Sequence, residues 1–362
     1  MTNAIPLRFH WTLSQAGDNL RASGKFEGLT GLLDFQEQLK LCKKAEENGI
    51  DSVLMAIGFT RPDPLMLATA LGLETERIKF LVAVRSGLIT PAYFVQQMNT
   101  ASHLIGDRLY INVVSGHTPS ELRYYGDFKE KEERNERTRE FMELCHAFWE
   151  KGSGIDYKGT YYQVENGAIN TPFNSEKRRP TIYISGNSER AVHLVSEYGD
   201  CLWRFPDTPE VIAEKIQPLA ASGKGAGLLT SIIARPTQEE AEHAAQELLK
   251  NFINNNKGVH KNYEQRYDSE GFREILDNAF NNDSHWLTPY LWNGAVPYLG
   301  APSIALVGSY ETVANALMEY KRAGITQFLF IGWPDIEEVV HFGQGVLPLV
   351  RGKEVEQMTS TV

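Results

Sequence analysis

Cysteine is scarce in this sequence and is not spaced for metal binding or cross-linking. The chain of 362 residues contains three cysteines, at Cys42, Cys145 and Cys201. An odd number at such wide spacing excludes a fully paired disulfide framework and a Cys-x-x-Cys metal site. Cys42 shares an apolar helical stripe with Leu39 and Ala45, so we expect it to be a small buried side chain.

Long apolar runs and an excess of basic charge are also missing. No segment approaches the ~20 apolar residues of a membrane span, and the first residues lack the apolar stretch of a signal peptide. We therefore expect a cytoplasmic protein with no membrane partner. The 46 acidic residues outnumber the 36 basic ones, giving a net charge of −10. This balance argues against nucleic acid as a partner, because phosphate binding needs concentrated Lys and Arg.

Several common catalytic signatures are absent as well. No Gly-x-Gly-x-x-Gly follows the first predicted strand and no Walker sequence occurs, so a Rossmann or nucleotide-hydrolysing site is not predicted. No His-x-x-x-His pair or acidic triplet predicts a metal site. Ser115-Gly116-His117 differs from the Gly-x-Ser-x-Gly elbow of hydrolases. The chemistry must therefore come from another kind of site.

Short apolar runs alternate with helical patterns along most of the chain. Apolar strands without polar alternation are typical of a parallel sheet covered on both faces. A closed barrel and an open doubly wound sheet both satisfy this pattern, and about eight strand–helix units favour an α/β fold of the (β/α)8 TIM-barrel type with insertions. The predicted strands are residues 7–13, 51–57, 77–84, 108–115, 181–185, 200–204, 228–234 and 326–332, with a further short apolar run at 303–307.

The chain is predicted to form one domain over residues 1–362, interrupted by two insertions. Residues 152–180 break the alternation, and Lys158-Gly159 predicts the turn of a β-hairpin followed by a loop. Residues 251–300 are poorly periodic and rich in Asn and aromatic residues. We interpret them as a mobile insertion over the active site. Its aromatic residues suggest an apolar or aromatic substrate: Trp286, Tyr290, Trp292 and Tyr298.

The carboxyl ends of the strands are where a parallel barrel places its site. Aromatic residues follow several predicted strands, and their rings suit a large planar ligand. Trp203 could equally cap the barrel core. Arg85 to Gly87 also lie at a strand end. The residues that we expect to contact the substrate are Trp11, Phe59, Trp203, Arg204, Phe205 and Ser231.

The segment Ile184-Ser-Gly-Asn-Ser carries the sharpest local signal. A strand ends in Ser185-Gly186, and Asn187 and Ser188 then open a helix. Backbone N–H groups at a helix N-terminus, side-chain hydroxyls and a glycine together form a cradle for phosphate. An ordinary Ser N-cap at Ser188 explains the same residues, so both interpretations stay open on the local sequence alone.

Several strand-end motifs occur in a recognisable order. They are Arg77-Ile-Lys-Phe-Leu-Val-Ala-Val-Arg, Asp107-Arg-Leu-Tyr-Ile-Asn-Val-Val-Ser-Gly, Glu133-Arg134-Asn135, the Ser185 segment, Thr288-Pro-Tyr-Leu-Trp-Asn-Gly, Ala305-Leu-Val-Gly and Phe342-Gly-Gln-Gly-Val-Leu-Pro-Leu-Val. From about residue 7 to 352, this series resembles the bacterial luciferase-like flavin monooxygenases, and most closely the alkanesulfonate monooxygenases. No single motif is highly specific, but their number and order make the resemblance strong.

The resemblance implies a two-component monooxygenase. Reduced FMN from a separate NAD(P)H:flavin reductase would react with O2 at its C4a atom, and the peroxyflavin would oxygenate a small-molecule substrate, such as a secondary metabolite. The flavin would carry the reaction while the protein positions it and excludes water. A homodimer or homotetramer is implied too. The residues implied to bind the flavin are Asn112, Ser115, Gly116, Arg134, Asn135, Ser185, Gly186, Asn187 and Ser188.

The substrate-holding part of the family pattern is replaced in this chain. Leu229 and Ser231 stand where the family has an Arg and a His, Leu299 stands for a second Arg, and Trp333 for a Tyr. Losing two Arg–anion contacts, each worth about 1.5–3 kcal/mol, predicts that simple alkanesulfonates are not the substrate. We expect a larger, less anionic metabolite instead. We expect catalytic roles for the residues His10, Arg61 and Trp333.

Two other functions stay open. A deazaflavin-dependent dehydrogenase of the same superfamily would transfer hydride without O2. A non-catalytic flavin-binding subunit would account for the missing Arg, His and Tyr. The sequence does not identify the substrate in any of these cases.

Overall fold

Eight parallel strands form a closed barrel in the computed structural model, which describes residues 5–13, 33–59, 61–116, 118–254, 262–282, 284–332 and 335–359. Their order around the barrel is β9-β12-β1-β2-β3-β4-β7-β8, and β8 pairs back onto β9. The predicted (β/α)8 barrel is confirmed. The strands are β1 (Arg8–Thr12), β2 (Ser52–Met55), β3 (Lys79–Arg85), β4 (Leu109–Val114), β7 (Thr181–Ser185), β8 (Cys201–Arg204), β9 (Gly225–Arg235) and β12 (Gln327–Gly332).

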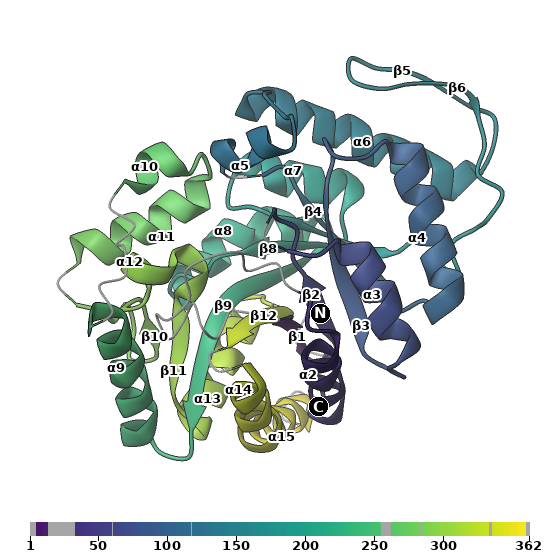
Figure 1. The fold of residues 1–362 in the computed structure, drawn as a ribbon. Coiled ribbons are helices and arrows are strands. Elements are labelled where there is room, and N and C mark those ends of the chain that lie inside the picture. Colours follow the sequence, from purple (N-terminus) through teal and green to yellow (C-terminus); the bar gives the residue numbers. More distant parts are fainter. Residues whose placement is uncertain are drawn as a thin grey trace.

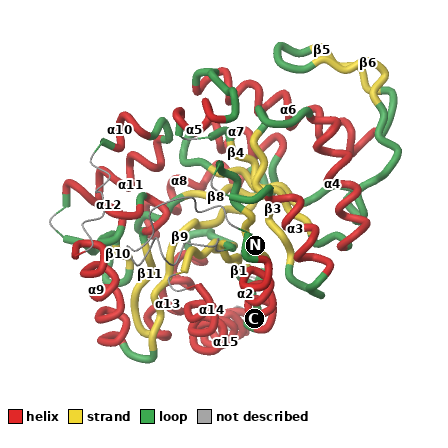
Figure 2. The backbone as a smooth tube through the Cα atoms, viewed as in Figure 1, coloured by secondary structure: helices red, strands yellow, loops and turns green. Residues whose placement is uncertain are grey.

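Helices between successive strands surround the barrel (Figure 2). Several begin at a side chain that accepts a hydrogen bond from the first turn, as Asp34 and Asp63 do, and proline stands at the first position where its missing N–H costs nothing. The covering helices are α2 (Phe35–Glu47), α3 (Pro64–Leu73), α4 (Pro91–Ile105), α5 (Pro119–Tyr124), α6 (Lys131–Lys151), α7 (Glu189–Tyr198), α8 (Pro209–Ala221), α13 (Tyr310–Arg322), α14 (Asp335–His341), the π-helix η3 (Phe342–Val346) and α15 (Leu347–Thr359).

Bulky side chains fill the inside of the barrel. Because neighbouring residues of a strand point to opposite faces, odd and even positions separate into an inner and an outer set. Inside, the indole of Trp203 stacks on the ring of Tyr183 with centroids 5.1 Å apart, and His10 meets the edge of both rings. Outside, Phe9 and Trp11 pack toward the helices with other buried aromatic residues. The filled interior leaves a ligand only the strand ends.

Strand β9 is longer than the other barrel strands and changes its neighbour along its length. Its first residues, Gly225 to Leu228, pair with β8, and its last, Ser231 to Arg235, pair with the extra strand β11 (Ala305–Ser309). A two-residue strand, β10 (Leu291–Trp292), extends this edge in antiparallel fashion. Side chains also join β9 to the segment before β11, because the Ser231 hydroxyl donates to the Pro302 carbonyl at 3.0 Å.

Residues 152–180 contain a hairpin of β5 (Ile155–Lys158) and β6 (Gln163–Gly167) that extends beyond α6 in Figure 1. The buried carboxylate of Glu140 on α6 accepts hydrogen bonds from the backbone N–H groups of Thr160, Tyr161 and Tyr162, at 2.8 to 3.3 Å. The Tyr162 hydroxyl donates to the carbonyl of Ser86, just after β3. The hairpin turn is thereby attached to a loop at the barrel mouth.

Residues 251–300 hold more regular structure than their composition predicts. They include the end of α9 (Gln238–Asn254), the short α10 (Tyr263–Arg266), α11 (Glu270–Asn281) and α12 (Val296–Leu299). Helix α11 begins at Ser269, whose hydroxyl caps it, and buries Ile275 and Leu276. A helix of 12 residues is hidden in the sequence by the Asn-rich stretches on either side of it.

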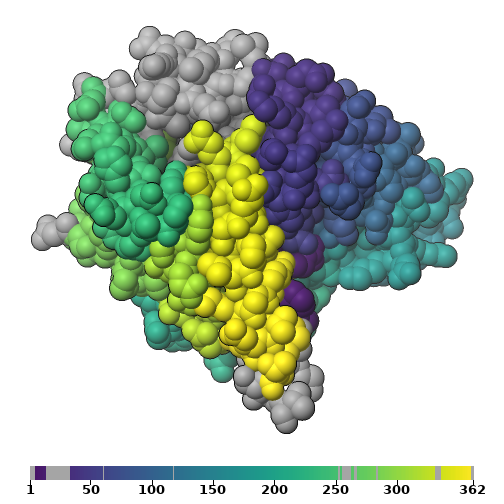
Figure 3. Space-filling model, turned by 90° about the horizontal axis from the view of Figure 1, so that it is seen from below, coloured from purple at the N-terminus to yellow at the C-terminus, as the bar shows by residue number. Residues whose placement is uncertain are grey.

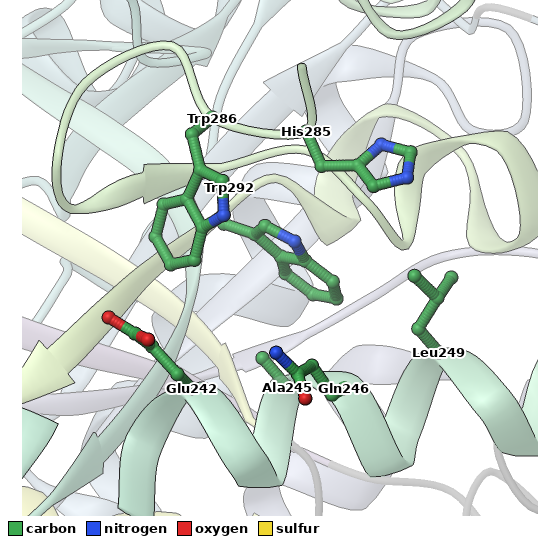
Figure 4. A pocket seen from close by; sticks show the side chains of 7 residues that line it. All are labelled: Glu242, Ala245, Gln246, Leu249, His285, Trp286 and Trp292. Atoms are coloured by element: carbon green, nitrogen blue, oxygen red, sulfur yellow. The ribbon is translucent and has the colours of Figure 1, made fainter. Parts of the chain in front are cut away.

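The tryptophans of this insertion pack against α9. A cavity of about 190 Å³ lies between α9 and the segment before β10, and its lining includes Trp286, Trp292 and His285 (Figure 4). Trp292 belongs to a small core formed by α9, β11 and the upper part of β9. Tyr290 donates to Glu319 on α13. These contacts lie outside the barrel, so the substrate-lining role suggested for Trp286, Tyr290 and Trp292 is not supported.

The first and last units of the chain close the barrel together. Strand β1 pairs with β12, and the space-filling view shows the C-terminal residues beside N-terminal ones (Figure 3). Glu354 of α15 accepts hydrogen bonds from the Leu7 backbone N–H at 2.6 Å and the Lys321 ammonium at 2.7 Å. Within the described residues, no helix is both long and apolar enough to cross a membrane.

Candidate active site

Two polar side chains on neighbouring strands meet at the barrel mouth. Asn112 of β4 and Ser185 at the end of β7 face the barrel interior, and the Ser185 hydroxyl donates to the Asn112 amide oxygen at 2.9 Å. Asn112 is 5% exposed, whereas the residue beside it on β3 is the small Ala83. The hydrogen bond holds both polar side chains at the mouth, where a polar ligand would fit.

The turn after β7 places small and capping residues beside the end of β8. The Gly186 N–H donates to the Trp203 carbonyl at 2.9 Å, and Ser188 caps α7 by accepting from the Ala191 N–H at 3.3 Å. A side chain at position 186 would come within 2.8 Å of the Ala191 Cβ, so the turn requires glycine for its close approach to α7. The N-cap interpretation of Ser188 is correct, and it leaves the helix N-terminus available to an anion.

The Asn187 side chain is held by the protein. Its amide nitrogen donates to Glu274 of α11 at 3.3 Å, and its amide oxygen accepts from the Phe205 backbone N–H at 3.2 Å. Asn187 therefore joins α7, the end of β8 and α11. This role could not be found in the sequence, because α11 was not predicted.

The turn after β4 brings together the other residues expected to bind flavin. Ser115 and half-buried Asn135 lie near it, and Gly116 has a φ of +86°, a conformation that favours glycine. The buried Arg134 guanidinium donates to the carbonyls of Ser115 and Lys129 and to the Asp268 carboxylate. All three of its nitrogens thus bind protein groups. Arg134 therefore holds the turn in place.

His10 is enclosed in the barrel interior, below the mouth. Its Nδ1 lies 2.7 Å from the Ser52 hydroxyl and its Nε2 lies 2.8 Å from the Gln327 amide oxygen. Tyr183 donates to the same oxygen, which is therefore an acceptor, so His10 Nε2 carries the proton. Burial and then the charge of Arg8 lower the pKa of His10 to about 3. The predicted catalytic role does not fit a neutral ring with both nitrogens occupied.

We expect the free energy of unfolding to fall more steeply between pH 6.5 and pH 5 in the wild-type protein than in His10→Gln. The folded protein keeps His10 neutral because its pKa is about 3, while the unfolded chain takes up a proton below its ordinary 6.5. The extra slope approaches about 1.4 kcal/mol per pH unit. Urea denaturation across this range measures it. His193→Gln, at an exposed position on α7, should keep the wild-type slope; equal slopes for all three proteins would contradict a neutral His10.

The predicted substrate residues separate into three groups. Trp11 is fully buried on the outer face of β1 against Phe330, so it cannot reach a ligand at the mouth. Trp203 and Ser231 are buried, the first in the barrel interior and the second against Pro302. The third group is Phe59, Arg204 and Phe205, of which only Arg204 is buried. Phe59 is 56% exposed and meets the edge of Tyr124, and Phe205 meets the edge of Phe272 on α11.

Arg204 is a buried cation next to the Ser185–Ser188 turn. It is 4% exposed, and its Nε has no hydrogen-bond partner among the residues that the structure describes. Burial lowers the pKa of Arg204, against the opposing effect of the charges of Glu274 and Asp207. Those two carboxylates bind Lys215 instead, at 2.5 and 3.5 Å. Arg204 is therefore available to a further anion.

The structure gives little geometry for the two remaining residues that were predicted to be catalytic, Arg61 and Trp333. Arg61 is half-buried in the loop after β2, where its backbone N–H donates to the Gly58 carbonyl at 2.9 Å. Trp333 lies outside the described residues. In the described part of the chain, no group of three or more His, Cys, Asp or Glu side chains is arranged to hold a metal ion.

Arg85 was not predicted to have a functional role; the sequence places it only at the end of a strand. It terminates β3, is 4% exposed, and donates from Nη2 to Glu121 of α5 at 3.1 Å. Its guanidinium lies over the Tyr125 ring at 5.6 Å from the centroid. Neither Nε nor Nη1 has an acceptor among the described residues. Only the position of α5, which the sequence did not predict, distinguishes Arg85 from other strand-end residues.

Comparison with known families agrees with this geometry. Residues 7–327 match the model of the luciferase-like monooxygenase family. The chain belongs to that family. The match covers all barrel strands up to the first residue of β12, and it includes both turns described above.

Solved structures of this fold have diverse activities. The EDTA monooxygenase of Chelativorans sp. BNC1 superimposes with a TM-score of 0.73 at 17% identity, covering 96% of this chain and 94% of that one. A 3,6-diketocamphane monooxygenase from Pseudomonas putida, in complex with FMN, gives 0.68 at 16% identity over 95% and 99%. An F420-dependent secondary alcohol dehydrogenase gives 0.68 at 17% identity over 96% and 99%. At these identities the likeness shows the shared fold.

Proposed function

We propose that this protein is a monooxygenase that uses reduced FMN and O2. The observation that carries the proposal is a set of buried polar atoms without partners at the carboxyl ends of the strands. Among the described residues these include the Thr12 hydroxyl, the Trp203 indole N–H and the Arg204 Nε. Because buried polar groups in proteins are nearly always paired, their gathering at one mouth indicates a polar ligand there. Family membership makes a flavin the ligand to test.

The residues at the mouth fit FMN. The Gly186 turn and the N-terminus of α7 would receive the phosphate, with Arg204 supplying the positive charge beside it. Asn112 and Ser185 would bind the polar edge of the ring or the ribityl chain. Asn187 and Arg134 would act indirectly, by holding the two turns in place.

FMN supplies the redox chemistry when it is bound, including the reaction with O2. The protein's own residues would orient the cofactor and exclude water. Stacked Trp203 and Tyr183 close the barrel beneath the site, so solvent cannot enter from below. His10 would contribute only to this packing. Simple alkanesulfonates are not expected as substrates, because Leu229 and Ser231 supply no positive charge.

Anaerobic titration with reduced FMN tests the proposal directly. We expect saturable binding, and about five- to tenfold weaker binding for Asn112→Ala, since one hydrogen bond to the ligand is lost. Ser185→Ala should weaken binding less, because its hydroxyl acts partly through Asn112. Ser196→Ala, on the distant side of α7, is the matched control and should bind as the wild type does. Failure of the wild type to bind reduced FMN would overturn the proposal.

A deazaflavin-dependent dehydrogenase is the second candidate. It is favoured by two solved neighbours that use coenzyme F420, the alcohol dehydrogenase and a tetrahydromethanopterin reductase from Methanopyrus kandleri. Parallel titrations with reduced FMN and reduced F420 separate the two functions. Tighter binding of F420, without O2 consumption, would replace the monooxygenase proposal.

The reduced flavin would come from a separate NAD(P)H:flavin reductase, as the family resemblance implies. Addition of a purified flavin reductase and NADH should start O2 consumption that the monooxygenase alone does not show. We also propose a homodimer or homotetramer, and light scattering of the purified protein distinguishes these from a monomer.

A further inference from the structure

The end of β3 carries a buried arginine, Arg85, whose guanidinium is only partly hydrogen-bonded. Lys79, Leu81 and Ala83 alternate with outward-packed residues, which places Arg85 on the interior side of the strand, directly at the mouth. Two of its three guanidinium nitrogens have no acceptor among the described residues, and the side chain is 5% exposed. Glu121 binds the third nitrogen, so the charge has a partner, but buried N–H groups without acceptors are costly and a further acceptor is expected for them.

Arg85 is separated from the cradle for the flavin phosphate. Strand β4 lies between β3 and β7, so two strand spacings of about 4.8 Å each separate Arg85 from the Ser185 turn across the sheet. Arg85 also lies one side-chain layer above Ala83, the neighbour of Asn112. The phosphate of FMN would lie at the turn beside Arg204, two strands away from Arg85. The two open nitrogens of Arg85 are therefore assigned to a second ligand.

The side chains around Arg85 indicate the chemistry of the rest of the ligand. Glu121 holds one nitrogen of the guanidinium, and Tyr125 lies against its face. Beside them, the rings of Phe59 and Tyr124 meet edge to face, with 56% and 67% of these residues exposed. An aromatic pair next to a buried cation suits a ligand that has an acidic head and an apolar body.

We propose that Arg85 binds the acidic group of the substrate, a carboxylate or phosphate on an apolar or aromatic body. This inference rests on the proposed function. It places the anion-binding arginine on β3, whereas the family resemblance places such residues at the positions of Leu229, Ser231 and Leu299. Glu121 is a positioning residue in this arrangement. Because its own carboxylate competes for the guanidinium, it weakens anion binding while it orients Arg85.

The test compares binding of 2-naphthoate with that of its neutral counterpart, 2-naphthamide, by equilibrium dialysis with and without FMN. We expect the wild type to bind the acid about tenfold or more tightly than the amide, since a charge-assisted contact is lost in the amide. Arg85→Gln should abolish this preference and Arg85→Lys should keep part of it. Glu121→Gln should strengthen acid binding, an effect that misfolding would not produce.

The matched control is Arg139→Gln, which removes an exposed arginine on α6 and should leave both probes unaffected. Equal binding of acid and amide by the wild type would overturn the inference, as would an undiminished preference in Arg85→Gln. If Arg85→Gln instead loses affinity for reduced FMN, the guanidinium serves the cofactor and the inference fails. Arg85-dependent acid binding without any FMN binding would overturn the proposed function alone.

Discussion

Replacing Glu354 with glutamine is expected to lower the free energy of unfolding by about 3–5 kcal/mol at neutral pH, because removing one partner of a buried ion pair leaves the other charge uncompensated. The Lys321 side chain is 2% exposed, and Glu354 is its ion-pair partner in the described structure. The same carboxylate accepts from the Leu7 N–H, next to β1. One substitution therefore disturbs the contact between α13, α15 and the first strand. Urea denaturation at neutral pH measures the loss.

The effect of Glu354→Gln should shrink in acid. Burial alone would raise the pKa of Glu354, but hydrogen bonds from Lys321, Leu7 and Arg351 outweigh it and hold the pKa below 4.5. A carboxylate with a lowered pKa stabilises the fold above its unfolded pKa and loses that contribution as the pH falls through the folded value. The difference between wild type and variant should therefore narrow below about pH 4.

The matched control for this pair is Glu311→Gln. Glu311 binds Lys353 at 2.6 Å, but its side chain is 57% exposed, so water replaces the lost contact. We expect a change of at most about 1 kcal/mol. Equal losses in Glu354→Gln and Glu311→Gln would show that burial does not determine the strength of these pairs.

Replacing Gly227 with alanine is expected to cost about 3 kcal/mol of stability by overpacking the barrel. A Cβ at this position on β9 would lie 2.2 Å from the Trp203 ring and 3.1 Å from the Gln327 carbonyl oxygen. The indole occupies that space because it stacks on Tyr183. Alanine would therefore displace the floor of the proposed site as well as the strand.

A double-mutant cycle with Trp203→Leu measures this clash. Each single change should destabilise the protein, and the double variant should be more stable than the sum of the two losses predicts, by about 1–3 kcal/mol. Additive losses would mean that the indole does not limit position 227. Gly352→Ala, in α15 with open space around it, is the control and should leave stability unchanged or slightly raised.

Much of the barrel could be predicted from the sequence, because its strands are apolar runs bounded by strong helix signals. Asp63-Pro64 and Pro91 mark helix starts where the structure has them. Which strand side chains point into the barrel and which point outward was harder to predict. His10 and Trp11 are adjacent, and one points into the barrel while the other points out. A shift of one residue reverses such an assignment, and the flanking sequence does not determine it.

The candidate site could be predicted only in part. Local motifs locate Asn112 and the Ser185 turn, since Asn112 lies inside a predicted strand and Ser185 ends the next one. The partners of Arg85 and Asn187 come from α5 and α11, which lie far from them in the sequence or were not predicted. Arg134 was predicted from its motif to contact the cofactor, and the structure adds what the motif could not show, that its nitrogens bind Ser115, Lys129 and Asp268.

The length of β9 has a consequence for how the site can vary. Its first residues, Gly225 to Leu228, pair with β8 and close the eight-stranded barrel. Its last residues, Ser231 to Arg235, pair with β11. The segment from α9 to β11 is thus joined to the barrel through main-chain hydrogen bonds, which tolerate many side chains. That segment supplies Asp268 and Glu274, whose carboxylates bind Arg134 and Asn187 at the barrel mouth. A change in the segment that β9 anchors would therefore reach both turns at the mouth without replacing any barrel strand.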